Sequence, residues 1–480
     1  MTIDFQSKQL SDPVYGVVGI SPLEGDILTT RVFQRLHNVK QLGLGATVYP
    51  GANYSRFAHS VGACHLAGEI VKSISRNAGR EFSDAEVQQY RLAGLLHDIG
   101  HYPFSHTFEH AIKNYYSARL TDVNGQDTDG SPPSFDHERM GHQVILLDPE
   151  LQAVFKKHGV DPDQIVASVS ARDPDFLSTV ISSDLDCDRL DYLVRTALHA
   201  GLPYGRVDVQ YIVSQMTLDD EGFPCLSDKA VRAADHLLIS RYFDFVQLPF
   251  HKTVCGMEIA LESVIEGMLT NRLVDCSASA MRERVEQGKW ARFDDHNVTQ
   301  LIEEELNRRD NETNIPYYAS LKSLVNRTPP VAVFQSDHVL DSDTVGMRET
   351  VEQLLQAKIE GWASKAGVDA KLWRVWKKNL GITKMGSKVR VSAAGDDPNE
   401  LDDEARTQLV QIQGGDRSRP TKAFPLIRMK EALVSTLSNQ KFSAVRVYVN
   451  LSLVDDRERK KNEIREMIRA DVPHLFAATA

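Results

Sequence analysis

Cysteine is scarce in this sequence, and its spacing excludes two common kinds of cross-link. Five cysteines occur in 480 residues, an odd number, and no two form a Cys-x-x-Cys pair. This argues against a disulfide framework and against a zinc site built from thiolates. No stretch of about 18 apolar residues is present, as a membrane-spanning helix would need, and residues 1–10 lack the apolar segment of a signal peptide. We therefore expect a cytoplasmic protein with no membrane partner.

Positive charge is also in deficit. Lysine and arginine number 55 against 66 aspartates and glutamates, which leaves a net charge of −11. General affinity for nucleic acid is therefore not expected, and an anionic ligand would need a local cationic pocket. Hydrophobic residues at 42% and charged residues at 25% are ordinary for a globular protein. The length allows two or three domains.

Histidine, in contrast, is concentrated in one stretch. An apolar helical pattern over residues 84–96 leads directly into His97-Asp98, and His101 and His106 follow closely. A glycine and a proline within the stretch favour the end of the helix there. Imidazole and carboxylate together are ligands of catalytic divalent metals. A His-Asp pair alone can equally be an ordinary helix end, so the interpretation depends on the rest of the chain.

Two further segments add histidines to this set. Arg56 and His59 lie three residues apart at the start of an expected helix, so they would point to one side of it. His59 could equally be a buried core histidine. After a polar, breaker-rich loop over residues 121–134, His137 begins another expected helix.

Four aspartates occur between Asp184 and Asp191, inside an apolar pattern that predicts a helix over residues 174–195. Asp184, Asp188 and Asp191 would share one face at i, i+4 and i+7, while Asp186 would point elsewhere. Buried acids need a cation or a metal, because isolated charge burial costs several kcal/mol. A solvated acidic stripe is the alternative.

The second half of the chain is less informative. Residues 235–266 predict a long helix kinked at Pro249, and residues 331–334 and 442–454 predict strands. The basic, aromatic segment 371–378 could bind a phosphate ligand or form an amphipathic helix packed on the core, and the helix is the commoner case. Residues 396–404 predict an acidic loop.

Together these segments outline a candidate metal site made of His59, His97, Asp98 and an aspartate from residues 184–191. Such a His₂Asp₂ set would leave positions open for water or a phosphate oxygen, as in catalytic sites. It suits Mn²⁺, Fe²⁺, Mg²⁺ or Zn²⁺. The remaining histidines could act as general acids, and nearby cations could hold phosphate oxygens; these cations are Arg56, Arg189, Arg241 and Lys252.

As an ordered set, the motifs resemble those of the HD-domain deoxynucleoside triphosphate triphosphohydrolases, in the branch of the sterile-alpha-motif HD-domain enzyme and its bacterial relatives. The motifs are Arg56-x-x-His59-Ser60, then His97-Asp98-x-Gly100-His101-x-Pro103-Phe104-Ser105-His106, then His137-Glu138, then Asp186-x-Asp188-Arg189-x-Asp191-Tyr192. The resemblance covers about half the chain. It implies a mainly α fold, with an HD-domain helical core over residues 1–270. A smaller α+β lobe with a short antiparallel sheet would follow over residues 271–480, for oligomerisation and allosteric contacts.

The resemblance also implies roles for individual positions. One divalent metal per subunit would be held by His59, His97, Asp98 and Asp188. The catalytic set would be His101, His106, His137 and Glu109. The substrate would be held by Arg56, Gln41, Leu42, Arg189, Tyr192 and Arg241. The sequence departs from the family at Thr196, near the sugar, at Pro249, where a base-stacking tyrosine is usual, and at Thr29, in the guanine-reading allosteric site.

The implied activity is metal-dependent hydrolysis of dNTPs to deoxynucleoside and triphosphate. The family pattern implies activation by a bound nucleotide, assembly as a homotetramer, and a role in limiting dNTP pools or in defence against phage. Two alternatives remain open: an HD phosphohydrolase that acts on another nucleotide or phosphodiester, and a nucleotide-binding regulator without catalysis.

Overall fold

The computed structural model describes residues 3–120, 136–170, 176–309, 312, 315, 317–342, 346–383, 407–414 and 421–473. The two loops expected over residues 121–134 and 396–404 lie outside these ranges. Within the described part of the chain, no helix has both the length and the apolar character needed to cross a bilayer. All five cysteines are buried and free.

The chain begins with an antiparallel hairpin of β1 (Lys8–Asp12) and β2 (Gly16–Ile20). Asp12 closes the turn, because its Oδ1 accepts from the backbone N–H groups of Val14 and Tyr15 at 2.8 and 3.0 Å. Short helical segments follow: α1 (Pro22–Leu28), α2 (Arg31–Gln34), η1 (Arg35–Asn38) and η2 (Gly43–Thr47).

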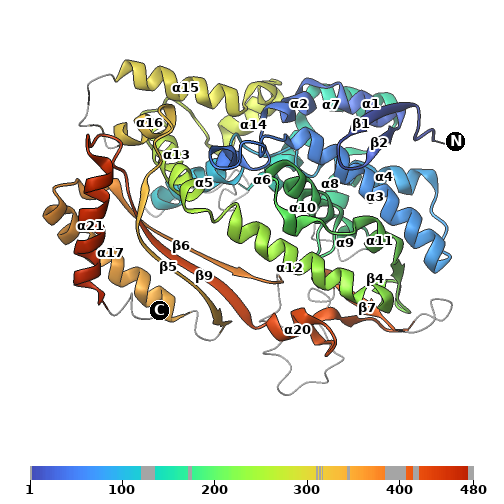
Figure 1. Cartoon of the computed structure of the whole chain (residues 1–480). Helices are drawn as coiled ribbons and strands as arrows, with labels where there is room; N and C mark the ends of the chain where they lie inside the picture. The colour runs from blue at the N-terminus through green and yellow to red at the C-terminus, as the bar shows by residue number, and fades with distance from the viewer. Residues whose placement is uncertain are drawn as a thin grey trace.

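The centre of the molecule is a group of packed helices. They are α3 (Arg56–Ala78), α4 (Asp84–Leu96), α5 (His106–Leu120), α6 (His137–Leu147), α7 (Pro149–His158), α8 (Pro162–Val169), α9 (Phe176–Ile181) and α10 (Cys187–Ala200). Helix α3 packs against both α4 and α10, near the N-terminal hairpin of β1 and β2 (Figure 1). Close approach of α3 and α4 depends on Gly94, where an added Cβ would lie 2.8 Å from the Ala63 carbonyl oxygen. This packing brings the N-terminal end of α3 beside the C-terminal end of α4.

The continuous helix expected over residues 174–195 is wrong. Helix α9 ends at Ile181, and α10 begins only at Cys187. Asp186 is the N-cap, with its carboxylate accepting from the N–H groups of Ser183 and Arg189 at 2.8 and 2.7 Å. Asp184 therefore lies outside the helix and does not share a helical face with Asp188.

The helix expected over residues 235–266 is also divided. Helix α12 (Val231–Gln247) and α13 (Lys252–Thr270) are separate elements, and the His251 side chain caps the second. Pro249 breaks the helix rather than kinking it, because proline lacks the N–H that the helix would need.

Between α10 and α12 lie η3 (Pro203–Gly205), α11 (Val209–Ser214), β3 (Met216–Leu218), β4 (Pro224–Ser227) and η4 (Asp228–Ala230). Strands β7 (Gln411–Gln413) and β8 (Phe424–Pro425) complete a four-stranded sheet in the order β3-β4-β7-β8. Pairing of β7 with β4 thereby attaches β7 and β8, which come late in the chain, to the helical core.

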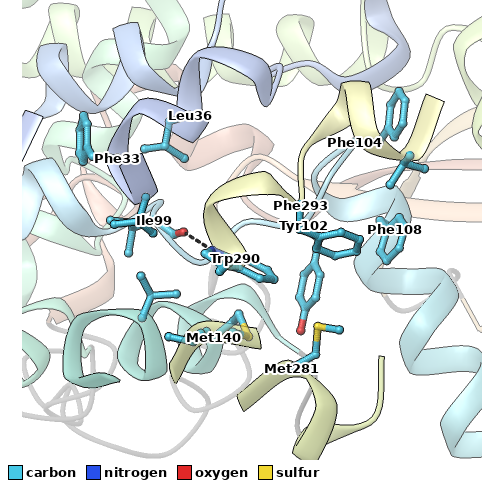
Figure 2. Packing of buried hydrophobic residues seen from close by; sticks show 14 of the residues in the cluster. Phe33, Leu36, Ile99, Tyr102, Phe104, Phe108, Met140, Met281, Trp290 and Phe293 are labelled. Atoms are coloured by element: carbon cyan, nitrogen blue, oxygen red, sulfur yellow. Dashed lines mark hydrogen bonds between the residues drawn. The ribbon is translucent and has the colours of Figure 1, made fainter. Parts of the chain in front are cut away.

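After α13 come α14 (Ala278–Glu286), η5 (Trp290–Arg292), α15 (Asp295–Arg308) and α16 (Tyr318–Val325). Their apolar residues join the same core as the first helices. Figure 2 shows Trp290 and Phe293 packed beside Ile99, Tyr102 and Phe108, with the Trp290 indole N–H donating to the Ile99 carbonyl oxygen at 3.3 Å. The division of the chain at residue 270 stays a prediction.

A separate apolar cluster forms the C-terminal lobe. Its antiparallel sheet has the order β5-β9-β6, with β5 (Val331–Asp341), β6 (Trp373–Gly381) and β9 (Gln440–Val449). The remaining elements are α17 (Met347–Ala366), η7 (Ala370–Leu372), η8 (Leu426–Arg428), α20 (Leu433–Leu437) and α21 (Arg457–Asp471). The mainly α fold with a smaller α+β lobe is confirmed, as is the strand predicted over residues 331–334. The strand predicted over residues 442–454 is confirmed as far as Val449, where β9 ends. The helix expected over residues 371–378 is wrong, because residues from Trp373 onward form the edge strand β6.

Candidate metal centre and active site

Four side chains from three helices converge at the centre of the helical core. His59 comes from the first turn of α3, His97 caps the end of α4, Asp98 follows it, and Asp188 lies in the first turn of α10. The Nε2 atom of His59 lies 3.2 Å from His97 Nε2, 3.0 Å from Asp188 Oδ1 and 3.6 Å from Asp98 Oδ2. His97 Nε2 lies 3.4 Å from Asp98 Oδ1 and 3.7 Å from Asp188 Oδ1.

The far side of each imidazole is fixed by an acceptor. His59 Nδ1 donates to the Asp191 carboxylate at 2.8 Å, and His97 Nδ1 donates to the Gly94 carbonyl oxygen at 2.8 Å. These contacts occupy the Nδ1 side of each ring and turn both Nε2 atoms toward the carboxylates of Asp98 and Asp188. The donor atoms of His59, His97 and Asp98 lie close enough to one another to share a divalent cation, and Asp188 Oδ1 lies beside both Nε2 atoms. The group could therefore hold a metal ion.

Burial and charge at this group also favour a cation. Burial alone would lower the pKa of His59, but hydrogen bonds to Asp188 and Asp191 raise it to about 10. Burial opposes ionisation of Asp98, yet the guanidinium of Arg56 beside it holds the pKa of that carboxyl well below its usual range. His59 is fully buried, whereas the Asp188 side chain is 34% exposed, so the group is open on the Asp188 side.

A second group lies directly beside the first and contains His101, His106, His137 and Glu109. Glu109 Oε2 lies 3.3 Å from His106 Nδ1 and 3.0 Å from His137 Nδ1. The ring of His101 stacks on that of His137, with centroids 3.9 Å apart. His101 Nε2 lies 3.1 Å from Asp98 Oδ1, so Asp98 joins the two groups.

The turn that leads into this second group is strained. Phe104 and Ser105 both adopt left-handed backbone conformations, with φ of 55° and 57°, immediately before His106 begins α5. Asp295 holds the turn by accepting from the Phe104 N–H at 2.7 Å. Ser105 Oγ accepts from Arg56 Nε at 2.9 Å and donates to the Lys40 carbonyl oxygen at 3.0 Å. The turn thus sets the direction of His106, whose side chain is 61% exposed.

The expected substrate residues of the first segments lie next to this turn. Arg56 contacts both Asp98 and Ser105 and is buried. Gln41 and Leu42 directly follow Lys40, and the Gln41 N–H donates to the Tyr54 carbonyl oxygen at 3.1 Å. The side-chain oxygen of Gln41 is buried without a hydrogen-bond partner.

Two other expected substrate residues, Arg189 and Arg241, converge on one buried carboxylate, that of Asp184. The closest atoms are 3.7 Å apart for Arg189 and 3.5 Å apart for Arg241. Arg189 also lies 3.3 Å from Asp186. Burial raises the pKa of Tyr192, and the charges of both arginines lower it, which places its ring near them. The structure therefore brings Arg189, Arg241 and Tyr192 together on the Asp188 side.

At two of the three positions that depart from the family pattern, the residue has a structural role in the fold. Thr196 is buried, and its hydroxyl lies 2.8 Å from that of Tyr54. Pro249 lies between α12 and α13.

Sequence reasoning missed the contacts of Ser105, Asp184 and Asp295. Asp191 could have been found, because i, i+3 spacing from Asp188 put it on the same helix face; nothing in the sequence connects Asp295 with the site.

Comparison with known proteins agrees with this geometry. Residues 56–170 match the family model described as HD domain. The expected resemblance to HD-domain triphosphohydrolases is confirmed by relatives at about 30% identity.

Among these relatives is the uncharacterized protein YwfO of Bacillus subtilis, 32% identical over 54% of this chain and 55% of that protein. Another is the deoxynucleoside triphosphate triphosphohydrolase SAMHD1 of Bos taurus, 31% identical over 41% of this chain and 36% of that protein. The chain thus spans about half the length, or less, of these relatives.

Solved structures extend the likeness in fold. A phosphohydrolase from Bacteroides thetaiotaomicron has a TM-score of 0.65 at 21% identity, covering 92% of this chain and 99% of the other. A hypothetical protein from Aquifex aeolicus has a TM-score of 0.67 at 22% identity, covering 95% and 99%. At these identities the structures show a shared fold only.

Proposed function

We propose that this chain is a metal-dependent hydrolase that converts dNTPs to deoxynucleoside and triphosphate. One observation carries the proposal: a buried donor set that fits a divalent ion lies in direct contact with a histidine–glutamate group, through the 3.1 Å approach of Asp98 and His101. Arg56 contacts Asp98, which joins the two groups, and Arg189 directly follows Asp188 in the chain. The relatives named deoxynucleoside triphosphate triphosphohydrolase favour dNTPs over other phosphate esters.

The metal-binding roles fall to His59, His97, Asp98 and Asp188. A single Mn²⁺, Mg²⁺, Fe²⁺ or Zn²⁺ bound there would supply Lewis-acid stabilisation of the developing charge and activation of water. The chain's own contribution is to fix the donors, since the outer nitrogen of each imidazole is already hydrogen-bonded.

The proton needed by the leaving group would come from the second group. Water adds to the α-phosphorus, the bond from phosphorus to the 5′ oxygen breaks, and that oxygen takes a proton to give the deoxynucleoside. His101, His106 and His137 are the candidates for proton transfer and phosphate contact, because near-neutral imidazoles do both. Glu109 would orient two of them through their Nδ1 atoms. Bonds to Glu109 raise the pKa of His137 against the opposing effect of burial, so His137 can carry a proton near neutral pH.

Substrate binding would use the cations and the tyrosine around the two groups. Arg56, Arg189, Tyr192 and Arg241 would contact the triphosphate, and Gln41 and Leu42 would line the sugar. The Asp184 and Asp186 carboxylates hold the side chains of Arg189 and Arg241 close together, and positioning of this kind supplies much of the rate in phosphoryl transfer. Nucleotide activation and assembly as a homotetramer belong to the same proposal, with pool control or phage defence as its biological role.

Product analysis provides the direct test. The purified chain is incubated with each dNTP, alone and in mixtures, with Mn²⁺ or Mg²⁺, and the products are separated by anion exchange. Triphosphate and deoxynucleoside in equal amounts are expected. Release of pyrophosphate or orthophosphate, or turnover of cyclic nucleotides and diesters far above that of dNTPs, would support a different HD phosphohydrolase. No turnover in any mixture, in a protein that contains metal, would contradict the proposal.

A further inference from the structure

We propose that Asp191, held in place by Arg195 and Asp12, is the positioning residue that prepares His59 to bind metal, which makes the N-terminal hairpin part of the metal centre. This inference rests on the metal centre of the proposed function. It concerns three residues that lie outside the candidate donor set, and it connects residues separated by nearly two hundred positions.

The contact with His59 has the geometry of an outer carboxylate partner. Asp191 Oδ2 lies 2.8 Å from His59 Nδ1, on the side of the ring opposite Nε2. Both side chains are fully buried. A carboxylate in this position keeps the proton on Nδ1, fixes the plane of the ring and makes Nε2 a stronger donor.

Arg195 fixes Asp191 in turn. One turn further along α10, its Nε donates to Asp191 Oδ2 and one terminal nitrogen donates to Asp191 Oδ1, both at 2.8 Å. Its other terminal nitrogen donates to Asp12 Oδ2 at 2.8 Å. The guanidinium therefore joins two carboxylates, and its planar fork leaves Asp191 little freedom to rotate.

The backbone of the core is shaped around this arrangement. A Cβ added at Gly62 on α3 would lie 1.9 Å from Asp191 Oδ1 and 2.4 Å from an Arg195 nitrogen. Any side chain at this position would displace the carboxylate from His59. Asp12, at the other end of this arrangement, is equally fixed, since its second oxygen accepts hydrogen bonds from two backbone N–H groups of the hairpin turn.

Charge balance explains why three ionised groups are used instead of one. Asp12, Arg195 and Asp191 together carry one net negative charge in the buried interior. An isolated carboxylate would be costly there, and one whose charge was cancelled by an arginine of its own would be a weaker partner for His59. With Asp12 present, the ionised Asp191 can serve both Arg195 and His59, and the remaining negative charge favours a divalent cation at Nε2.

The test measures metal affinity without substrate. Mn²⁺ binding to the full chain, stripped of metal with chelator, is followed by calorimetry and by electron paramagnetic resonance. For Asp191→Asn we expect the Mn²⁺ Kd to rise by about 10- to 100-fold. For Asp12→Asn, one step further from His59, we expect a smaller rise of about 3- to 10-fold, because Arg195 stays in place but loses one anchor.

A matched control separates positioning from general loss of stability. Glu24 is also buried and paired bidentately with an arginine of the core, Arg91, at 2.7 and 2.8 Å, but it contacts no candidate ligand. Glu24→Gln should lower the thermal midpoint at least as much as Asp12→Asn while leaving the Mn²⁺ Kd within about twofold of the wild-type value.

The outcomes distinguish the inference from the proposed function. A wild-type chain that binds no divalent ion would remove the metal centre itself. A wild-type chain that binds Mn²⁺, together with unchanged affinity in folded Asp191→Asn, would overturn only the positioning role. Loss of affinity in Glu24→Gln equal to that in Asp12→Asn would overturn it as well. If Asp191→Asn does not fold, the comparison between Asp12→Asn and Glu24→Gln decides the question.

Discussion

The two histidine groups of this site are adjacent but built on different principles. In the first group, the Nδ1 of His59 donates to Asp191 and the Nδ1 of His97 donates to the Gly94 carbonyl oxygen. Both Nε2 atoms face carboxylates. In the second group, His106 and His137 share a single acceptor, Glu109. The first group lies deeper, with His59 fully buried and an opening on the Asp188 side, whereas the second has a largely exposed member, His106.

This difference indicates different tasks. Two imidazole nitrogens that converge with two carboxylates need a cation among them, so the first group is arranged to hold an ion. In the second group two histidines share one carboxylate, and one of them, His106, is exposed to what approaches from solvent. That arrangement suits proton transfer. Asp98 contacts both groups, so under the proposed function one substrate phosphate would reach them together.

The largest expected effect comes from breaking the first group. We expect Asp98→Asn to lose bound metal and to lower dNTP turnover by at least about 1,000-fold, because a neutral amide is a poor ligand and one arginine and three histidines lose their common partner. The fold should persist, since the amide keeps the size of the side chain. Elemental analysis measures the bound metal, kinetics measure the turnover, and circular dichroism checks the fold. Wild-type metal content with wild-type turnover would exclude the ligand role.

Breaking the second group should give a smaller loss. For Glu109→Gln we expect retained metal and about a 100-fold lower kcat, in the range of lost general acid–base catalysis. Hydrogen bonds to Glu109 raise the pKa of His137, so the variant should lower that pKa. If protonated His137 is the acid, activity falls as pH rises through its pKa, and this decline should move to lower pH in Glu109→Gln. A pH–kcat profile of both proteins measures the shift.

The same pair makes stability depend on pH. Hydrogen bonds to His106 and His137 hold the pKa of Glu109 well below its usual range, against the effect of burial. Its contribution is therefore present above the unfolded value of 4.5 and is lost as pH falls. The raised pKa of His137 gives a contribution that is complete below the unfolded value of 6.5 and is lost as pH rises through the folded value. Both contributions are present between pH 4.5 and 6.5. Urea unfolding should therefore show that Glu109→Gln lowers the free energy of unfolding most in this pH range. An unchanged profile would contradict a coupled pair.

The sequence was sufficient for the helices that carry the ligands. The cap at Ser55 and the apolar pattern up to Leu96 fixed where His59 and His97 fall, and these are local signals. The ligand candidates could therefore be named as a set. Their meeting at one point depends on packing between α3, α4 and α10, which the pattern of a single sequence does not contain.

The errors have a common physical cause. Apolar periodicity continues through residues 182–186, but Asp186 satisfies backbone N–H groups with its side chain and starts a new helix. The segment after Lys371 has helix-forming lysines, yet pairing with β9 makes it an edge strand. In both places a hydrogen-bonding partner outweighed periodicity, and for β6 that partner lies about 70 residues away in sequence.

The smallest expected effect concerns the strained turn between the two groups. Ser105→Ala removes the hydroxyl that joins Arg56 to the Lys40 carbonyl and keeps the left-handed backbone, so we expect about 1–2 kcal/mol lower stability and a severalfold lower kcat/KM. Ser105→Gly loses the same hydroxyl but relieves the backbone, which favours it over Ser105→Ala by up to about 1 kcal/mol. Urea unfolding and steady-state kinetics measure both variants. Equal kinetic losses would assign the effect to the hydroxyl that holds Arg56 between the groups. A loss confined to the glycine variant would show instead that stiffness of the turn, and through it the direction of His106, links the metal group to the proton-transfer group.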